Sequence, residues 1–260
     1  MVAIAFIGMI QHEISKDSFR KLIQTVKSDA ICDSIVVCSA DGLFSTASKL
    51  DEQLELLFDS GIDLVFVGEQ AISRNCCRSV FAKGEWPIIK AINLPGSTDK
   101  SSIKRIDHNG EAFWFISTSG QKGKIPVDYS YLKLDGFLKN KNDNLPVIIL
   151  ESNAEYKYLQ ALAYRYSKLD YSVLLLGAGA GFITSPTLRY SDKCYLQCDI
   201  GSVVTENTVN GFDSELWWKK NIERRAITLI PQWGSLICDY SIVYLKEGKI
   251  EKFFTKSVRI

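Results

Sequence analysis

The chain has 260 residues, of which 46% are hydrophobic and 23% charged. This balance is typical of an ordinary globular protein and excludes a disordered or fibrous one. Lys and Arg number 31 against 30 for Asp and Glu, so no global field favours nucleic acid or an anionic membrane surface.

The apolar N-terminus, 1–10, has no basic region or cleavage site typical of a signal peptide and is predicted to be a buried strand. No apolar run reaches the roughly 20 residues that span a bilayer, so we expect a cytoplasmic protein without a membrane anchor. The cysteines are odd in number and lie largely in apolar runs, which predicts buried thiols: Cys32, Cys38, Cys76, Cys77, Cys194, Cys198 and Cys238.

Short apolar runs alternate with helical patterns along the first part of the chain, which predicts an α/β fold. A strand over 3–8 precedes a helix over 15–26, where Phe19, Leu22, Ile23 and Val26 share one face. Strands over 34–38 and 63–67 flank a second helix that ends at Gly61. The spacing thus predicts three strand-to-turn junctions early in the chain.

The middle is less regular, with strands expected over 87–92 and 111–117 and a loop over 93–104. Strands over 146–150 and 172–176 flank a predicted helix over 154–167. Antiparallel strands are expected at the end, over 195–200, 226–230, 237–245 and 249–255, with a helix over 214–225 between them. Since no linker or repeat interrupts this pattern, we expect a single domain over 1–260.

Ligands of α/β sheets gather at the carboxyl ends of strands, so the turns after the buried runs are the informative segments. These turns are Gly8-Met9-Ile10, Ser39-Ala40-Asp41-Gly42, Gly68-Glu69-Gln70-Ala71, Glu151-Ser152-Asn153-Ala154-Glu155 and Gly177-Ala178-Gly179-Ala180-Gly181.

In order and spacing the turns resemble those of the YmdB-like metallophosphoesterases of the calcineurin-like superfamily. That family carries Gly-Asp-Ile, Asn-Gly-Glu-Asn, Gly-Asn-His, Asp-Phe-His-Ala-Glu and Gly-Thr-His-Thr-His at these places. The segments 88–95 and 197–201 are similar to its Arg-Pro-Ala-Asn-Phe-Pro and Thr-Asp-Val-Gly. The resemblance implies an αββα sandwich with mixed sheets, and an activity in which two divalent metals hydrolyse phosphodiesters, including cyclic nucleotides.

Most metal ligands that the resemblance implies are replaced in this chain. The aspartate of the first strand corresponds to Met9, whose thioether is a poor ligand for hard ions. The Glu-Asn pair corresponds to Ala40 and Asp41, and the Asn-His pair to Glu69 and Gln70; an amide cannot relay a proton as imidazole does. The remaining imidazoles correspond to Asn153, Gly179 and Gly181.

The two histidines of the chain, His12 and His108, lie in polar, loop-like sequence away from these junctions. We expect His108 at the surface, while His12 follows the first strand and is either a solvated loop residue or a neighbour of the old pocket. The oxygens that remain there, including those of Asp199, suit at most one weak Mg²⁺ or Ca²⁺.

Other motifs are open to two interpretations. The alternating glycines of 177–181 do not match the dinucleotide fingerprint; they indicate close backbone packing or room for a nucleotide-like ligand in the vacated pocket. Cys194 and Cys198 would lie about 13 Å apart on one strand, too far for one zinc ion. Trp217 and Trp218 stand beside basic residues, so one indole is either half covered or part of a contact surface for a partner or an identical subunit.

The sequence therefore predicts a degenerate metallophosphoesterase-like protein, with no catalytic residue and no cofactor, that acts as a binding, regulatory or scaffold protein. We expect a protein partner or self-association. The alternative is a metal-dependent phosphodiesterase with a rearranged or single-metal site on Asp41, Glu69, Asn153 and Asp199.

Overall fold

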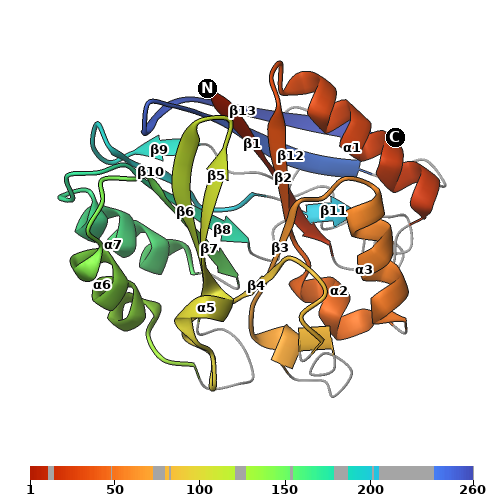
Figure 1. Ribbon diagram of the computed structural model, residues 1–260, viewed down its shortest axis with the longest axis horizontal. Coiled ribbons are helices and arrows are strands. Elements are labelled where there is room, and N and C mark those ends of the chain that lie inside the picture. The colour runs from red at the N-terminus through yellow and green to blue at the C-terminus, as the bar shows by residue number, and fades with distance from the viewer. Residues whose placement is uncertain are drawn as a thin grey trace, which may run out of the picture.

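The computed structural model describes residues 1–10, 15–47, 49–72, 80–81, 83–120, 127–152, 155–178, 187–200, 202–204 and 237–259. Two mixed β-sheets face each other, and helices cover their outer faces (Figure 1). This arrangement confirms the predicted α/β sandwich. No helix in these ranges is long and apolar enough to cross a membrane.

Within the described residues, the first sheet has seven strands in the order β13-β12-β11-β1-β2-β3-β4. Strands β1 to β4 are parallel, and β12 and β13 add an antiparallel hairpin. The strands are β1 (Val2–Ile10), β2 (Ser34–Ser39), β3 (Leu64–Val67), β4 (Ile88–Lys90), β11 (Ser202–Val204), β12 (Ile237–Lys246) and β13 (Lys249–Arg259). Between them lie α1 (Lys16–Asp29), α2 (Asp41–Thr46), α3 (Leu50–Asp59) and the short 3-10 helix η1 (Glu69–Ile72).

The second sheet has six strands in the described ranges, in the order β5-β6-β7-β8-β10-β9. Its four central strands are parallel and both edge strands are antiparallel. The strands are β5 (Ile103–His108), β6 (Glu111–Ser119), β7 (Val147–Ser152), β8 (Val173–Ala178), β9 (Thr187–Arg189) and β10 (Cys194–Gln197). The helices are α5 (Asp99–Ser102), α6 (Ser130–Asn140) and α7 (Tyr156–Tyr166).

Two predictions about strands were wrong. The expected loop over 93–104 contains α5 and the start of β5, which pairs with β6 through a turn at Asn109 and Gly110. Both turn residues have positive φ, 49° and 79°, so the Asn-Gly pair was a hairpin signal. The strand over 195–200, expected among the antiparallel strands at the end, is β10. It pairs in antiparallel with β9 but in parallel with β8, so it belongs to the second sheet and not with β12 and β13. The predicted elements over 214–225 and 226–230 lie outside the described residues.

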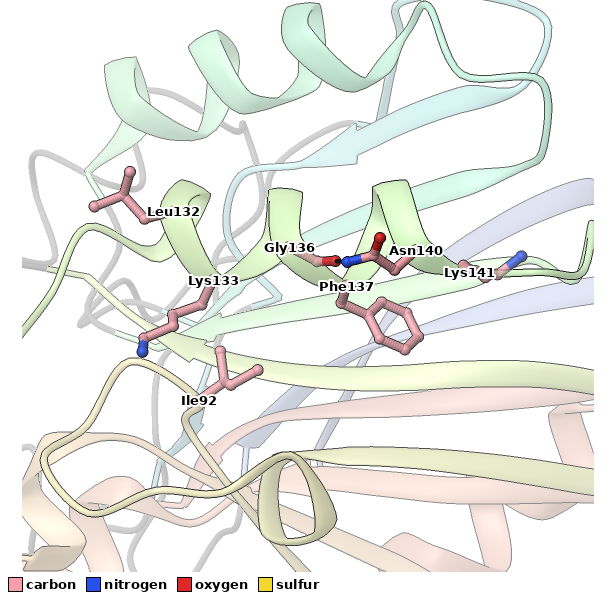
Figure 2. Close-up of a pocket in the computed structure, with 7 residues that line it drawn as sticks. All are labelled: Ile92, Leu132, Lys133, Gly136, Phe137, Asn140 and Lys141. Carbon is pink, nitrogen blue, oxygen red and sulfur yellow. Dashed lines mark hydrogen bonds between the residues drawn. The ribbon is translucent and has the colours of Figure 1, made fainter.

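Helix α6 was not predicted, because its pattern of apolar residues is weak. Its fully buried residues are only Ser130, Leu134 and Leu138, and Gly136 interrupts the helix interior. Contacts to α7 hold it instead: Asp135 accepts hydrogen bonds from the Arg165 guanidinium. Figure 2 shows residues of its more exposed side.

The core forms layers that follow the alternation of side chains along the central strands. On β1, Ala3, Ala5 and Ile7 face the helices, whereas Val2, Ile4 and Phe6 face the second sheet. Phe6 meets Phe115 edge to face across the two sheets, with ring centroids 6.2 Å apart.

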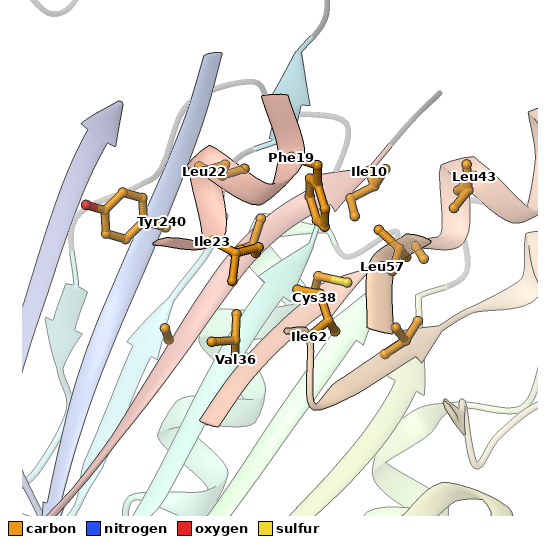
Figure 3. Packing of buried hydrophobic residues seen from close by; sticks show 14 of the residues in the cluster. Ile10, Phe19, Leu22, Ile23, Val36, Cys38, Leu43, Leu57, Ile62 and Tyr240 are labelled. Carbon is orange, nitrogen blue, oxygen red and sulfur yellow. The ribbon is translucent and has the colours of Figure 1, made fainter. Parts of the chain in front are cut away.

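The helical face predicted for α1 is confirmed. Phe19, Leu22, Ile23 and Val26 are all buried against the first sheet (Figure 3). The stripe of apolar side chains at helical spacing therefore decided which side of α1 packs on the strands.

The prediction of buried thiols is confirmed for Cys38, Cys194, Cys198 and Cys238, and was wrong for Cys32, which is only half-buried. All five are free thiols, while Cys76 and Cys77 lie outside the described residues. Burial raises the pKa of the Cys198 thiol to about 11, so it is protonated at neutral pH.

Ile31, between α1 and β2, adopts a conformation that is unfavourable for a β-branched residue. Its φ is 61° and the residue is 85% exposed. The residues on either side of it are joined by a hydrogen bond, in which the Cys32 amide donates to the Ala30 carbonyl at 2.6 Å. This is a strained three-residue turn.

We expect Ile31→Gly to raise the free energy of unfolding by about 1 kcal/mol, measured by urea denaturation, because glycine adopts positive φ without a steric penalty. Ile31→Val is the control, and equal stability of the two variants would refute the strain.

Candidate functional site

The register of both sheets brings the carboxyl ends of their parallel strands to one edge. In the first sheet, Met9 on β1 pairs with Ser39 on β2, which pairs in turn with Phe66 on β3. In the second sheet, Ser119 on β6 pairs with Ser152 on β7. The turns singled out in the sequence follow these ends, so the fold assembles them where α/β proteins bind ligands.

The two sheets meet at this edge through Gly68, directly after β3. The Gly68 amide donates to Asp41 Oδ1 at 3.0 Å, and both groups are buried. A Cβ atom at Gly68 would lie 1.9 Å from Ser152 Oγ and 2.9 Å from Asp41 Oδ2. Ser152 of the second sheet therefore packs against the bare backbone of the first, and only glycine fits there.

Asn93 forms a second link between the sheets. Its Nδ2 donates to the Ser119 carbonyl at 2.7 Å and to the Asp128 carbonyl at 2.8 Å, and its Oδ1 accepts from the Ser119 amide at 2.8 Å. The side chain thus binds the end of β6 with both of its polar atoms. Sequence reasoning placed Asn93 at the start of a loop and assigned it no role.

Glu151, the penultimate residue of β7, lies in a network of hydroxyl groups. Its Oε2 accepts from Thr118 Oγ1 at 3.1 Å and from Ser130 Oγ at 3.2 Å, while its Oε1 has no partner among the described residues. Ser130 Oγ also lies 3.0 Å from the Tyr158 hydroxyl on α7. Burial raises the pKa of the Glu151 carboxyl to about 7, because the two hydroxyl donors only partly offset the loss of solvent.

At the second sheet, the chain after β10 packs closely on Gly177 of β8. The Ile200 amide donates to the Gly177 carbonyl at 2.9 Å, and a Cβ at Gly177 would lie 2.2 Å from the Cys198 carbonyl oxygen. Asp199 lies between these contacts and is partly buried. Of the two interpretations of these glycines, close packing of the backbone is therefore the one that fits Gly177.

The predicted site residues divide into those that the structure describes and those that it does not. Met9, Ala40, Asp41 and Glu69 are buried at the strand ends, and Met9 is only 4% exposed. Gln70 belongs to η1. The Gln70 side chain and residues His12, Asn153, Gly179, Gly181, Trp217 and Trp218 lie outside the described residues, so their roles stay predictions.

His108 lies far along the strands from this edge. It ends β5 and pairs with Glu111 at the start of β6, whereas Ser119 ends that strand. Its Nε2 is 3.3 Å from Asp33 Oδ2, and its side chain is 30% exposed. The expectation that His108 is not part of the strand-end site agrees with this position, although it lies in a strand and not in a loop.

The described strand ends supply fewer metal ligands than a two-metal centre needs. Such a centre needs several carboxylate, amide and imidazole ligands around two hard ions. Here the described matched positions carry a thioether at Met9, a methyl at Ala40 and two carboxylates, Asp41 and Glu69, of which Asp41 accepts the Gly68 amide. In the described ranges, no three His, Cys, Asp or Glu side chains lie together as a metal-binding group.

This architecture, two mixed sheets between helices, is the fold of calcineurin-like phosphoesterases. The chain is similar to a hypothetical protein from Thermus thermophilus, with 19% identity, a TM-score of 0.74 and 99% of each chain covered. It is also similar to a phosphatase from Mycoplasma pneumoniae, with 14% identity, a TM-score of 0.71, and 100% of this chain and 93% of that one covered. The calcineurin-like phosphoesterase YfkN from Bacillus subtilis has 13% identity and a TM-score of 0.50, with 99% and 90% covered.

The family follows from a second comparison. A family model described as YmdB-like protein matches residues 5–250, so the chain belongs to the YmdB-like family. No curated protein matches the chain. At these identities the solved structures establish the fold, and the activity is a separate question.

Proposed function

We propose that this YmdB-like protein uses its phosphoesterase fold for binding and not for hydrolysis of phosphodiesters. The observation that carries the proposal is that Met9 and Ala40, both buried at the strand ends, stand where the family resemblance implies metal-binding side chains. At the edge where the fold would hold metals, the strand-end carboxylate binds the neighbouring backbone. The side chains beside it, Met9 and Ala40, supply a thioether and a methyl group.

The chemistry of phosphodiester hydrolysis explains why these replacements matter. Two metals activate the attacking water and stabilise the charge that develops on the phosphoryl oxygens, so the catalytic power depends on the ligands that hold them. A soft, neutral thioether binds Mg²⁺ or Mn²⁺ poorly, and a methyl group does not bind them at all. The residues described at this edge therefore support no catalytic metal step.

What the protein binds follows from the same proposal. We propose a nucleotide-like ligand at the strand ends, or a protein partner or second copy at the surface of Trp217 and Trp218. The support for a nucleotide-like ligand is the position of these turns at the carboxyl ends of parallel strands, where α/β proteins bind ligands. We also propose one domain over 1–260 that acts without a cofactor.

The activity test compares the wild-type chain with a double variant, Asp41→Asn with Glu69→Gln. Both replacements keep a side-chain oxygen, so the Gly68 amide retains its acceptor. We expect hydrolysis of bis(4-nitrophenyl) phosphate and 2′,3′-cyclic AMP with Mn²⁺, Fe²⁺ or Mg²⁺ to stay at the protein-free rate for both proteins. A metal-dependent phosphodiesterase of known activity serves as the positive control.

Metal-dependent turnover that falls ~tenfold or more in the double variant would overturn the proposal. That result would favour a rearranged or single-metal phosphodiesterase built on Asp41 and Glu69. Metal analysis of the purified wild type and double variant also distinguishes a binding protein from a phosphodiesterase. A catalytic site would retain a stoichiometric ion in the wild type and lose it in the double variant.

A further inference from the structure

An open pocket of about 410 Å³ lies along the more exposed side of α6 (Figure 2). One side of the helix supplies most of its lining, and Ile92 after β4 and Lys141 after α6 complete it. The residues from α6 are Leu132, Lys133, Gly136, Phe137 and Asn140. The volume lies in the range of small-molecule sites.

Gly136 keeps the middle of this cavity open. It lies in the interior of α6, where glycine is less favourable than alanine because it loses more backbone freedom on folding. A Cβ built on Gly136 would meet no described atom within 4 Å. No steric conflict therefore requires glycine here, and a larger side chain at this position would enter the cavity.

The ionic groups around the cavity are paired, with one exception. Asp135 binds Arg165 and Lys139, and Asp143 binds Lys141. The Lys141 side chain is only 1% exposed and its ammonium lies 4.0 Å from the centre of the Tyr171 ring, so its charge is compensated. Lys133 forms no ion pair within the part of the chain that the structure describes.

One wall of the pocket is apolar, formed by Ile92 and Phe137, whereas Lys133, Asn140 and Lys141 make much of the remaining lining polar. The Phe137 ring packs edge to face on Trp114, with centroids 5.4 Å apart, and the Trp114 indole donates to Asp143 at 3.1 Å. Ile92 is anchored through its amide, which donates to the Ser117 carbonyl at 2.8 Å. A ligand that enters thus meets an apolar surface that is already ordered.

From these features we infer that the cavity binds a small amphipathic anion, an aryl or alkyl carboxylate. Its apolar body would lie against Ile92 and Phe137, and its carboxylate would pair with the Lys133 ammonium. The site does not use Met9, Asp41 or Glu69, so it does not depend on the proposed function.

Calorimetric titration of the full chain with 4-phenylbutyrate tests this inference. Its neutral and cationic analogues, 4-phenylbutan-1-ol and 4-phenylbutylamine, test the role of charge. We expect the carboxylate to bind most tightly, Lys133→Gln to weaken it ~tenfold, and Gly136→Phe to abolish binding by filling the cavity. Two matched controls, Lys139→Gln and Gly136→Ala, are expected to stay within about twofold of the wild type, since neither fills the site or removes its cation.

The inference is overturned if the alcohol or the amine binds as tightly as the carboxylate, or if Lys139→Gln weakens binding as much as Lys133→Gln. It is also overturned if the wild type shows no saturable binding of the carboxylate up to about 10 mM. Should Gly136→Phe fail to give the wild-type circular dichroism spectrum, Gly136→Met replaces it as the cavity-filling variant.

Discussion

Gly68→Ala is expected to lower the free energy of unfolding by about 3 kcal/mol, because it forces a methyl group into a contact between the two sheets. The new Cβ would lie 1.9 Å from Ser152 Oγ, and neither residue is free to move toward solvent, since both are buried. Asp41 Oδ2, at 2.9 Å, restricts movement in another direction. Urea denaturation followed by circular dichroism measures the loss.

A second substitution tests whether this loss comes from the proposed contact. Ser152→Gly removes both Ser152 atoms that the new Cβ would meet, so we expect the double variant to recover at least half of the lost stability. The control is Gly136→Ala on α6, which meets no described atom and should gain about 0.5–1 kcal/mol. If the changes in the free energy of unfolding caused by Gly68→Ala and Ser152→Gly simply add in the double variant, the contact between the sheets is not what requires glycine.

A large effect of pH on stability is expected from Glu151. Burial raises the pKa of its carboxyl from 4.5 to about 7, so between these values the folded chain holds a proton that the unfolded chain releases. A group that binds more protons in the folded state stabilises it most at low pH, and this stabilisation is lost as the pH rises through about 7. The difference corresponds to about 3 kcal/mol between pH 4.5 and pH 8.

Glu151→Gln should remove this part of the pH dependence. The amide keeps an oxygen that accepts from Thr118 and Ser130 but never ionises, so we expect the variant to exceed the wild type in stability at pH 8 and not at pH 5. Free energies of unfolding at a series of pH values give the comparison, and the exposed Glu155→Gln should parallel the wild type. Parallel profiles for Glu151→Gln and the wild type would show that this carboxyl does not titrate in the window.

The strand-end site was only partly predictable. Met9, Ala40, Asp41 and Glu69 lie at the ends of parallel strands because each follows a buried run, while their role as a site remains a prediction. The network around Glu151 was not predictable, since Thr118, Ser130 and Tyr158 come from three elements distant in sequence. The single-domain organisation remains a prediction.

Local patterns in the sequence determined the elements whose side chains repeat at helical or strand spacing. Phe19 to Val26 predicted the buried face of α1, and the apolar runs predicted β1, β2, β3, β7 and β8, because burial of one face needs only local periodicity. The tertiary structure alone decided the features that depend on contacts between distant segments. It formed α6 despite Gly136, set Gly68 against Ser152, and buried the Glu151 carboxyl, because packing across two sheets is a non-local property that no local pattern records.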